Sequence, residues 1–233
     1  MNGMDDLKQK AGIEACRFVE DGMSLGLGTG STVRFSIIEI ARMVGEEGLD
    51  IIGVPTSEAT RELAESLGIP LAELGQIRRL DLTIDGADEF DPHFDLIKGG
   101  GGALTREKIV AMASQAMVVV ADETKRVGTL GEFDLPVEVD PNAWENARDA
   151  ISMHCPGDVQ LRGDSESPYV TDNGGYILDC SFGPIISDPE SLEREIKEIG
   201  GVVEVGLFVG ICDAVVVASQ DGVSTLVKPG GRL

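Results

Sequence analysis

The stretch "MSLGLGTGSTVRFSIIEIARMV", residues 23–44, decides the fold. Met23–Leu27 has the length and apolar character of a strand, and Thr32–Val44 repeats apolar residues at the three- and four-residue spacing of an amphipathic helix. The glycines between them allow a tight turn from the strand directly into the helix. A strand followed at once by a helix is the repeating unit of a parallel sheet, so this stretch predicts an α/β fold.

The same alternation continues along the chain as far as residue 121. The predicted elements are a strand at 50–54, a helix at 57–67, a strand at 81–85, a helix at 104–114 and a strand at 117–121. This series predicts a Rossmann-like parallel sheet with helices on both faces.

From Gly131 the pattern changes to β-α-β-β-α-β, which is the order of a small ferredoxin-like α+β domain. The final segment, 213–228, has the pattern of a hairpin that returns to the first sheet. We therefore expect two domains. They are a Rossmann-like domain of residues 1–130 plus 207–233 and a ferredoxin-like domain of residues 131–206.

The chain is strongly acidic, with 41 Asp and Glu against 19 Lys and Arg and a formal charge of -22. Such a charge repels nucleic acid and anionic membranes, so we expect no nucleic-acid and no membrane partner. It favours solubility, and the alternative is adaptation to a salt-rich cytoplasm. The sequence has no apolar run of about 20 residues and no secretion signal pattern, which predicts a cytoplasmic location.

The cysteines and histidines do not form a metal motif. The four cysteines are scattered without C-x-x-C spacing: Cys16, Cys155, Cys180 and Cys212. They are expected to be small core residues. His93 and His154 have no partner at helical spacing, which favours structural roles. We therefore predict no metal site and no cofactor.

Polar residues follow several of the predicted strands, where open parallel sheets bind ligands. "GLGTGSTV", 26–33, has glycines that permit close approach, and Ser31 or Thr32 begins a helix whose free N–H groups can hold a phosphate. Its spacing fits neither a P-loop nor a dinucleotide-binding fingerprint. The alternative is an ordinary tight βα turn with an N-cap residue.

"DGADEFD", 85–91, follows the third predicted strand. Asp85 ends that strand, and Gly86 and Ala87 leave little bulk beside it, so Asp85 and Asp88 could face one crevice. Crowded carboxylates raise at least one pKa, which favours acid–base chemistry. The alternative is a solvated turn.

"KGGGGALTREK", 98–108, places four glycines between Lys98 and a predicted helix. Backbone N–H groups of such a run can surround an oxyanion, to which Lys98 adds a positive charge. Glu107 lies in the first turn of the helix, where the helix dipole also favours a carboxylate for structural reasons alone. In "ADETK", Lys125 follows another strand and is a second candidate anion ligand.

Together these blocks resemble a known family. "GTGST", "DGADE", "KGGGGALTREK" and "ADETK", in this order and spacing, resemble the signature blocks of type A ribose-5-phosphate isomerase. "PVEV", "VTDNG" and "GVVEVGLF" resemble its later blocks, so the resemblance runs along nearly the whole chain. Gly102, where the family is expected to have alanine, and the tail "KPGGRL" are departures from it.

The resemblance implies an enzyme of the pentose phosphate pathway that interconverts D-ribose 5-phosphate and D-ribulose 5-phosphate through an enediolate, without a metal. It implies that Glu107 is the base, that Lys98 stabilises the oxyanion, and that Asp85 and Asp88 hold sugar hydroxyls and assist ring opening. The implied substrate-binding residues are Lys8, Thr29, Gly30, Ser31, Thr32, Asp85, Gly86, Ala87, Asp88, Lys98, Gly99, Gly100, Gly101 and Lys125. A homodimer or homotetramer is expected.

Two other functions are compatible with a fold of this class. One is a sugar-phosphate sensor, which would need a DNA-binding module that the acidic chain lacks. The other is acyl transfer in the manner of coenzyme A transferases, with Glu107 as a covalent nucleophile.

Overall fold

The computed structural model describes residues 3–77 and 79–233. The chain forms two compact units: residues 1–87, 106–125 and 211–233 make the first, and residues 88–105 and 126–210 make the second. These limits differ from the domain boundaries expected from the sequence, which placed 88–105, 126–130 and 207–210 with the first domain. That division into functional domains stays a prediction.

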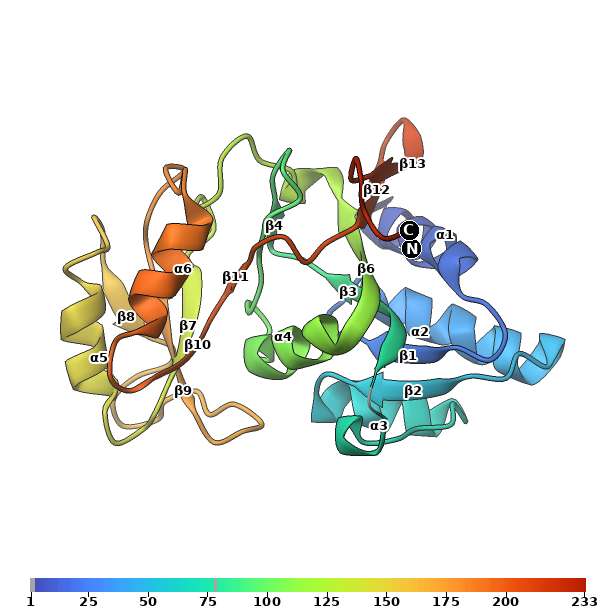
Figure 1. Ribbon diagram of the computed structural model, residues 1–233, viewed down its shortest axis with the longest axis horizontal. Coiled ribbons are helices and arrows are strands. Elements are labelled where there is room, and N and C mark those ends of the chain that lie inside the picture. Colours follow the sequence, from blue (N-terminus) through green and yellow to red (C-terminus); the bar gives the residue numbers. More distant parts are fainter. Residues whose placement is uncertain (1–2, 78) are drawn as a thin grey trace. The chain divides into compact units, whose positions relative to one another are not determined.

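The first unit is built on a six-stranded sheet with the strand order β13-β12-β6-β3-β1-β2 (Figure 1). Its strands are β1 (Ser24–Leu27), β2 (Ile52–Pro55), β3 (Leu80–Gly86), β6 (Ser114–Asp122), β12 (Ala214–Ser219) and β13 (Gly222–Val227). All neighbours pair in parallel except β13, which is antiparallel to β12. The expected parallel sheet and the return of the C-terminal hairpin to it are therefore confirmed.

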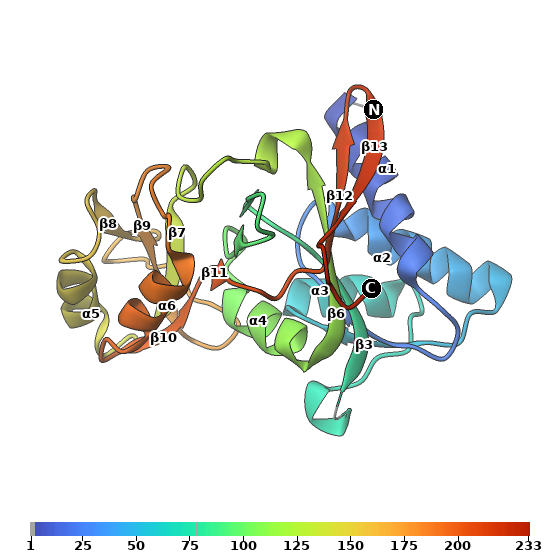
Figure 2. The same cartoon turned by 45° about the horizontal axis from the view of Figure 1, so that its top comes forward.

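Helices cover both faces of this sheet. α1 (Gly3–Ala15), α2 (Val33–Arg42) and α3 (Glu58–Ser66) contribute to one apolar cluster with the strands, whereas Val110 of α4 (Leu104–Ala113) packs with Val54 and Leu80 in another. Figure 2 shows α1 and α2 on one side of β6 and α4 on the other. The short helical turns are η1 (Cys16–Phe18), η2 (Met43–Glu47), η3 (Leu74–Gln76) and η4 (Glu123–Lys125).

Helix α1 was not predicted from the sequence. Its fully buried residues include Ala11 and Ala15, so its apolar face is made partly of small side chains that give a weak periodic signal. A Cβ atom on Gly12 would lie 2.8 Å from Cβ of Phe35 in α2, which shows how closely the two helices pack. Close packing of small side chains therefore stabilises α1, whereas sequence analysis recognises helices by large apolar side chains.

The second unit contains a four-stranded antiparallel sheet of order β10-β7-β9-β8. Its strands are β7 (Leu135–Val139), β8 (Val159–Leu161), β9 (Tyr176–Cys180) and β10 (Val202–Val205), and its helices are α5 (Trp144–Ile151) and α6 (Pro189–Lys197). With the chain order β-α-β-β-α-β, this strand order is the ferredoxin-like arrangement that the sequence predicted.

A three-stranded sheet in the same unit was not predicted. It consists of β4 (Glu89–Phe90), β5 (Leu96–Ile97) and β11 (Leu207–Phe208), in the order β11-β5-β4. Each strand has two residues, too few to show the alternation by which strands are recognised.

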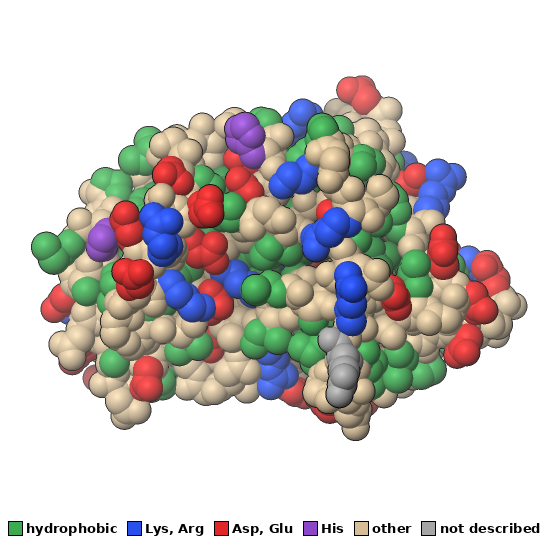
Figure 3. All heavy atoms as spheres, viewed as in Figure 1, with side chains coloured by type: hydrophobic (Ala, Val, Ile, Leu, Met, Phe, Trp, Pro, Cys, Tyr) green, Lys and Arg blue, Asp and Glu red, His purple; other side chains and the backbone are tan. Residues whose placement is uncertain are grey.

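The cysteines, the charged side chains and the apolar helices were the basis for the expectations about metals, nucleic acid and membranes. The four cysteines are buried and free, as expected for core residues. Figure 3 shows acidic side chains spread over the visible face with basic side chains between them. Within residues 3–77 and 79–233, no helix is long and apolar enough to cross a bilayer.

The C-terminal tail "KPGGRL", which departs from the family pattern, is anchored by the buried carboxylate of Asp213. Asp213, just before β12, is 3 % exposed, and its Oδ1 accepts hydrogen bonds from the backbone N–H of Arg232 (3.0 Å) and from its Nε (2.9 Å). Oδ2 accepts from Nη2 of Arg232 (2.7 Å) and from the N–H of Met117 (2.9 Å). Burial alone pushes the pKa of Asp213 up, but these hydrogen bonds outweigh it, so the pKa lies below its usual value.

Arg232→Ala should lower the free energy of unfolding by about 2 kcal/mol at neutral pH, because it leaves a buried carboxylate short of its donors. The pKa of Asp213 is lowered in the folded protein, so its contribution is present above the pKa of the unfolded chain and is lost as pH falls through the folded value. The gap between wild type and variant should therefore close as Asp213 becomes protonated. Thermal unfolding across pH measures this.

Arg148→Ala is the matched control, because Arg148 pairs with Asp149 at the surface and such pairs contribute roughly 0–1 kcal/mol. Equal melting temperatures for Arg232→Ala and Arg148→Ala at pH 7 would contradict the anchoring role of Asp213.

Candidate functional site

Asp85 lies at the end of β3 and is fully buried. Its Oδ1 accepts hydrogen bonds from the N–H groups of Thr29 (3.0 Å) and Gly86 (2.7 Å). A Cβ atom on Gly28 would lie 2.2 Å from the same oxygen, so only glycine fits there. The carboxylate thus rests on the turn that follows β1, and the two neighbouring strands bring together residues 56 positions apart in the sequence.

The hydroxyl of Thr29 is the centre of a cluster that the sequence did not reveal. Its Oγ1 is 2.7 Å from Oγ1 of Thr56, 2.8 Å from Oγ of Ser57 and 3.2 Å from Oγ1 of Thr60. Thr60 also donates to the carbonyl of Gly28 (2.9 Å). This network fixes the turn to the start of α3. The signal available in the sequence was the run of hydroxyl residues in "PTSEAT" directly after the second strand.

Lys8 and Ser31 lie together in the first unit. Nζ of Lys8, on α1, is 2.9 Å from Oγ of Ser31, which is exposed. Thr32 precedes α2, and its side chain makes no capping hydrogen bond. The turn therefore places the Lys8 side chain beside a helix whose N-cap residue, Thr32, makes no side-chain capping bond. This arrangement is suited to binding an anion.

Lys125 is placed by η4, at the end of the segment that follows β6. Its side chain is partly exposed, and it belongs to the same unit as Lys8 and Ser31.

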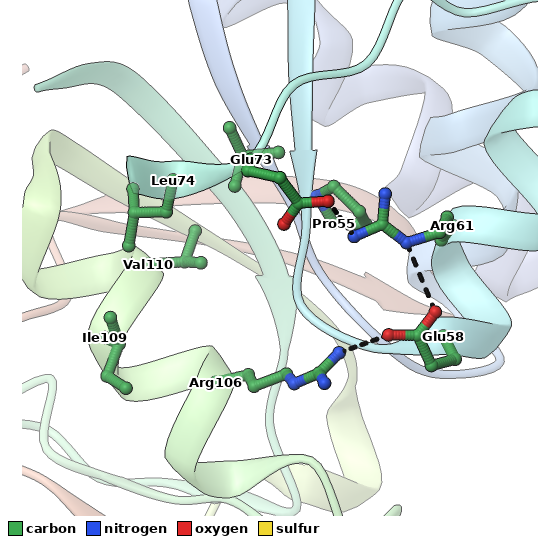
Figure 4. Close-up of a pocket in the computed structure, with 9 residues that line it drawn as sticks. Pro55, Glu58, Arg61, Glu73, Leu74, Arg106, Ile109 and Val110 are labelled. Atoms are coloured by element: carbon green, nitrogen blue, oxygen red, sulfur yellow. Dashed lines mark hydrogen bonds and ion pairs between the residues drawn. The ribbon is translucent and has the colours of Figure 1, made fainter. Parts of the chain in front are cut away.

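Glu107 is 4 % exposed and lies in the first turn of α4. Successive helical residues are rotated by about 100° around the axis, so Glu107 lies on a different part of the helix surface from its neighbour Arg106. Arg106, Ile109 and Val110 line a cavity of about 470 Å³, and Glu107 does not line it (Figure 4).

A row of alternating charges lines this cavity and joins α4 to α3 (Figure 4). Arg106 forms an ion pair with Glu58 (2.6 Å). Arg61 forms ion pairs with Glu58 (3.2 Å) and with Glu73 (2.7 Å). The hydrogen bond from Arg106, helped by Arg61, holds the pKa of Glu58 below its usual value. These ion pairs hold the first turn of α3 and the residue preceding Glu107 together.

In the second unit, Asp88 lies against the glycine run. Its Oδ2 accepts a hydrogen bond from the N–H of Gly100 (2.7 Å), and its own N–H donates to the carbonyl of Ile97 (2.8 Å). A Cβ atom on Gly100 would lie 2.6 Å from Oδ1 of Asp88, so a side chain at position 100 would displace this carboxylate.

Lys98 is 2 % exposed, and both its backbone N–H and its side chain make contacts. Its N–H donates to the carbonyl of Gly206 (2.9 Å), and Nζ lies 5.5 Å from the centre of the Phe208 ring. A lysine side chain over an aromatic face is favourable, so the Phe208 ring contributes to holding Lys98 in its buried position.

The other acids of "DGADEFD" have structural roles. Glu89 is buried and accepts the N–H groups of Gly131 (2.7 Å) and Phe133 (2.5 Å), and burial raises its pKa although these donors oppose it. Asp91 accepts the N–H groups of two residues in the turn that follows it, at 2.8 and 3.0 Å. The acidic run is thus partly a set of backbone anchors.

The predicted site residues therefore form two groups. The first unit holds Lys8, the turn at 29–32, Asp85, Gly86, Ala87, Glu107 and Lys125. The second holds Asp88, Lys98 and Gly99–Gly101. That Asp85 and Asp88 share one crevice stays a prediction. Among residues 3–77 and 79–233, no group of three or more His, Cys, Asp or Glu side chains is arranged to hold a metal ion.

Comparison with known proteins gives a consistent result. Residues 52–222 match the family model of ribose 5-phosphate isomerase A (phosphoriboisomerase A). The chain is 47 % identical to ribose-5-phosphate isomerase A 1 of Oceanobacillus iheyensis, over 96 % of this chain and 99 % of that protein.

Two solved structures are similar over their full length. One is ribose 5-phosphate isomerase A of Methanocaldococcus jannaschii, with a TM-score of 0.90 and 42 % identity over 96 % of this chain and 99 % of that one. The other, a D-ribose-5-phosphate isomerase in complex with phospho-erythronic acid, has a TM-score of 0.91 and 40 % identity over 96 % and 98 %. Both the family model and the relatives cover well over half of the sequence, and the chain belongs to the ribose 5-phosphate isomerase A family.

Proposed function

We propose that Glu107 is the base with which this chain, an aldose–ketose isomerase, interconverts D-ribose 5-phosphate and D-ribulose 5-phosphate. The activity, a step of the pentose phosphate pathway, follows from family membership. The observation that carries the residue assignment is the burial of Glu107 at the start of α4, within the part of the chain that matches the family model. Of the functions considered, this one is favoured over a sensor and over acyl transfer.

In this mechanism Glu107 removes the proton from C2 of the open-chain aldose. The C2–H electrons form the C1–C2 double bond, and those of the C1 carbonyl become the oxyanion of an enediolate. Return of the proton to C1, with transfer of the O2 proton to O1, gives the ketose. Lys98 stabilises the developing oxyanion.

Asp85 and Asp88 hold the sugar hydroxyls and assist ring opening. Each carboxylate accepts at least one backbone N–H, which orients it. The phospho-erythronic acid bound by a relative is a hydroxylated acid that carries a phosphate, and this chemistry supports a site for a phosphorylated, partly anionic sugar chain.

The 5-phosphate is held by the turn after β1 together with Lys8 and Lys125. Lys8 already lies 2.9 Å from Ser31, and the exposed Gly30 and Ser31 present backbone beside it. The hydroxyl of Thr29 bonds three side chains, so Thr29 contributes mainly by fixing the turn. A cytoplasmic location, the absence of a cofactor and a homodimer or homotetramer remain predictions.

Glu107→Gln should lower kcat by about 10² to 10⁴-fold with little change in the binding of ribose 5-phosphate, because glutamine keeps the size but cannot accept the proton. The variant should also lose exchange of the substrate C2 hydrogen with heavy water, followed by NMR. Glu190→Gln is the control, since Glu190 is an exposed glutamate in the first turn of α6. A folded Glu107→Gln protein with normal turnover would show that the base is another residue.

Lys8→Ala and Lys125→Ala should each raise KM for ribose 5-phosphate more than they lower kcat, because they remove charges that bind the phosphate before and during reaction alike. Free ribose should be a poor substrate. Lys10→Ala is the matched control, because Lys10 lies on the same helix and pairs with Asp6 at 2.7 Å. Similar kcat/KM for ribose and ribose 5-phosphate would contradict the phosphate assignment.

A further inference from the structure

One peptide group of the glycine run, Gly99–Gly100, is bonded on both sides. The carbonyl of Gly99 accepts a hydrogen bond from Nη1 of Arg162 (2.9 Å), and the N–H of Gly100 donates to Oδ2 of Asp88 (2.7 Å). The carbonyl and the N–H of a trans peptide point in opposite directions within one plane. The Gly99 carbonyl also accepts the N–H of Gly102 (2.9 Å), so Arg162 and this turn together set the orientation of the plane and hence where the N–H of Gly100 meets Asp88.

Arg162 is itself held in one orientation. Its Nε and Nη2 donate to the two carboxylate oxygens of Asp179, at 2.9 and 2.5 Å, in the paired geometry that is specific to arginine. The side chains of Arg162 and Asp179 are only 18 % and 25 % exposed. Arg162 follows β8 directly, Asp179 belongs to β9, and the N–H of Arg162 donates to Ile177 (2.8 Å). The ion pair between Arg162 and Asp179 is therefore supported by the paired strands β8 and β9.

The rest of the glycine run is held by Arg162 and by a tyrosine. Nη1 of Arg162 also donates to the carbonyl of Gly100 (3.2 Å), and the hydroxyl of Tyr169 donates to that of Gly101 (3.2 Å). The Arg162 guanidinium lies 5.7 Å from the Tyr169 ring centre. Three successive glycine carbonyls are thus bonded by two side chains, which removes the conformational freedom that glycines otherwise have.

We propose that Arg162, fixed by Asp179, is a positioning residue that orients Asp88 through the Gly99–Gly100 peptide. The inference rests on the proposed role of Asp88 in holding the sugar hydroxyls. Without Arg162, the Gly99 carbonyl still accepts the N–H of Gly102 but has lost its side-chain donor, so the direction of the Gly100 N–H that Asp88 accepts is less firmly fixed. A small misplacement of a group that holds the substrate lowers the rate strongly.

The test is a double-mutant cycle between Arg162→Gln and Asp88→Asn in the full-length enzyme. Arg162→Gln alone should lower kcat/KM for ribose 5-phosphate by roughly 10- to 100-fold, and Arg162→Lys, which keeps the charge without the paired geometry, should also be impaired. In the Asp88→Asn background, Arg162→Gln should change kcat/KM by less than about twofold, because the residue through which it acts is already lost. Arg148→Gln, at the surface of α5, is the control.

The possible outcomes distinguish a wrong role for Arg162 from a wrong role for Asp88. An equal fall in both backgrounds would overturn the positioning role, since Arg162 would then act independently of Asp88. A folded, fully active Arg162→Gln beside an impaired Asp88→Asn would also overturn it, while the role of Asp88 stands. A fully active Asp88→Asn would show that the proposed role of Asp88 is wrong, and the inference with it. If Arg162→Gln does not fold, the same cycle with Asp179→Asn decides between these outcomes.

Discussion

The contact between a carboxylate and a nearby backbone, with no side chain between them, is the constraint on which both groups of site residues depend. Asp85 rests on the turn that contains Gly28, and Asp88 rests on Gly100. In each case an added Cβ atom would fall within 2.6 Å of a carboxylate oxygen. Each glycine-containing loop thus has one position at which the absence of a side chain makes room for a charged group.

This constraint also explains how flexible loops come to hold charges in fixed directions. Glycine permits the close approach but supplies no rigidity of its own. In the first unit the hydroxyls of Thr56, Ser57 and Thr60 supply the rigidity. In the second unit it comes from Arg162 and Tyr169 together with the bond from the Gly102 N–H to the Gly99 carbonyl. A preorganised arrangement of this kind orders its donors and acceptors before substrate arrives, which lowers the reorganisation needed in the transition state.

The sequence predicted the parts of the fold that have strong local patterns. The β-α series and the ferredoxin-like order were found because long strands and amphipathic helices repeat apolar residues with a clear period. Helix α1 was missed because alanines form much of its buried face, and β4 and β5 were missed because each has two residues.

The site could be predicted only in part, for a different reason. Asp85, Asp88, Lys98 and Glu107 stand in blocks that resemble a known family and were recognised together. Arg162 contacts the glycine run although it lies 63 residues away in the sequence. The residues around it, "QLRGD", contain no pattern that predicts this contact. Residues that bond a loop from a distant strand give no local signal, because their partners are brought to them only by the topology of the sheet.

The backbone at Gly102 links two distant positions of the chain. Gly102 has a φ of 78°, and a Cβ atom there would lie 2.2 Å from the hydroxyl of Tyr169. Alanine at position 102 would take a left-handed backbone conformation that is uncommon for residues other than glycine, and it would displace the Tyr169 hydroxyl. The backbone conformation of residue 102 and the position of the Tyr169 ring are therefore coupled, and a change at either position alters the room available to the other.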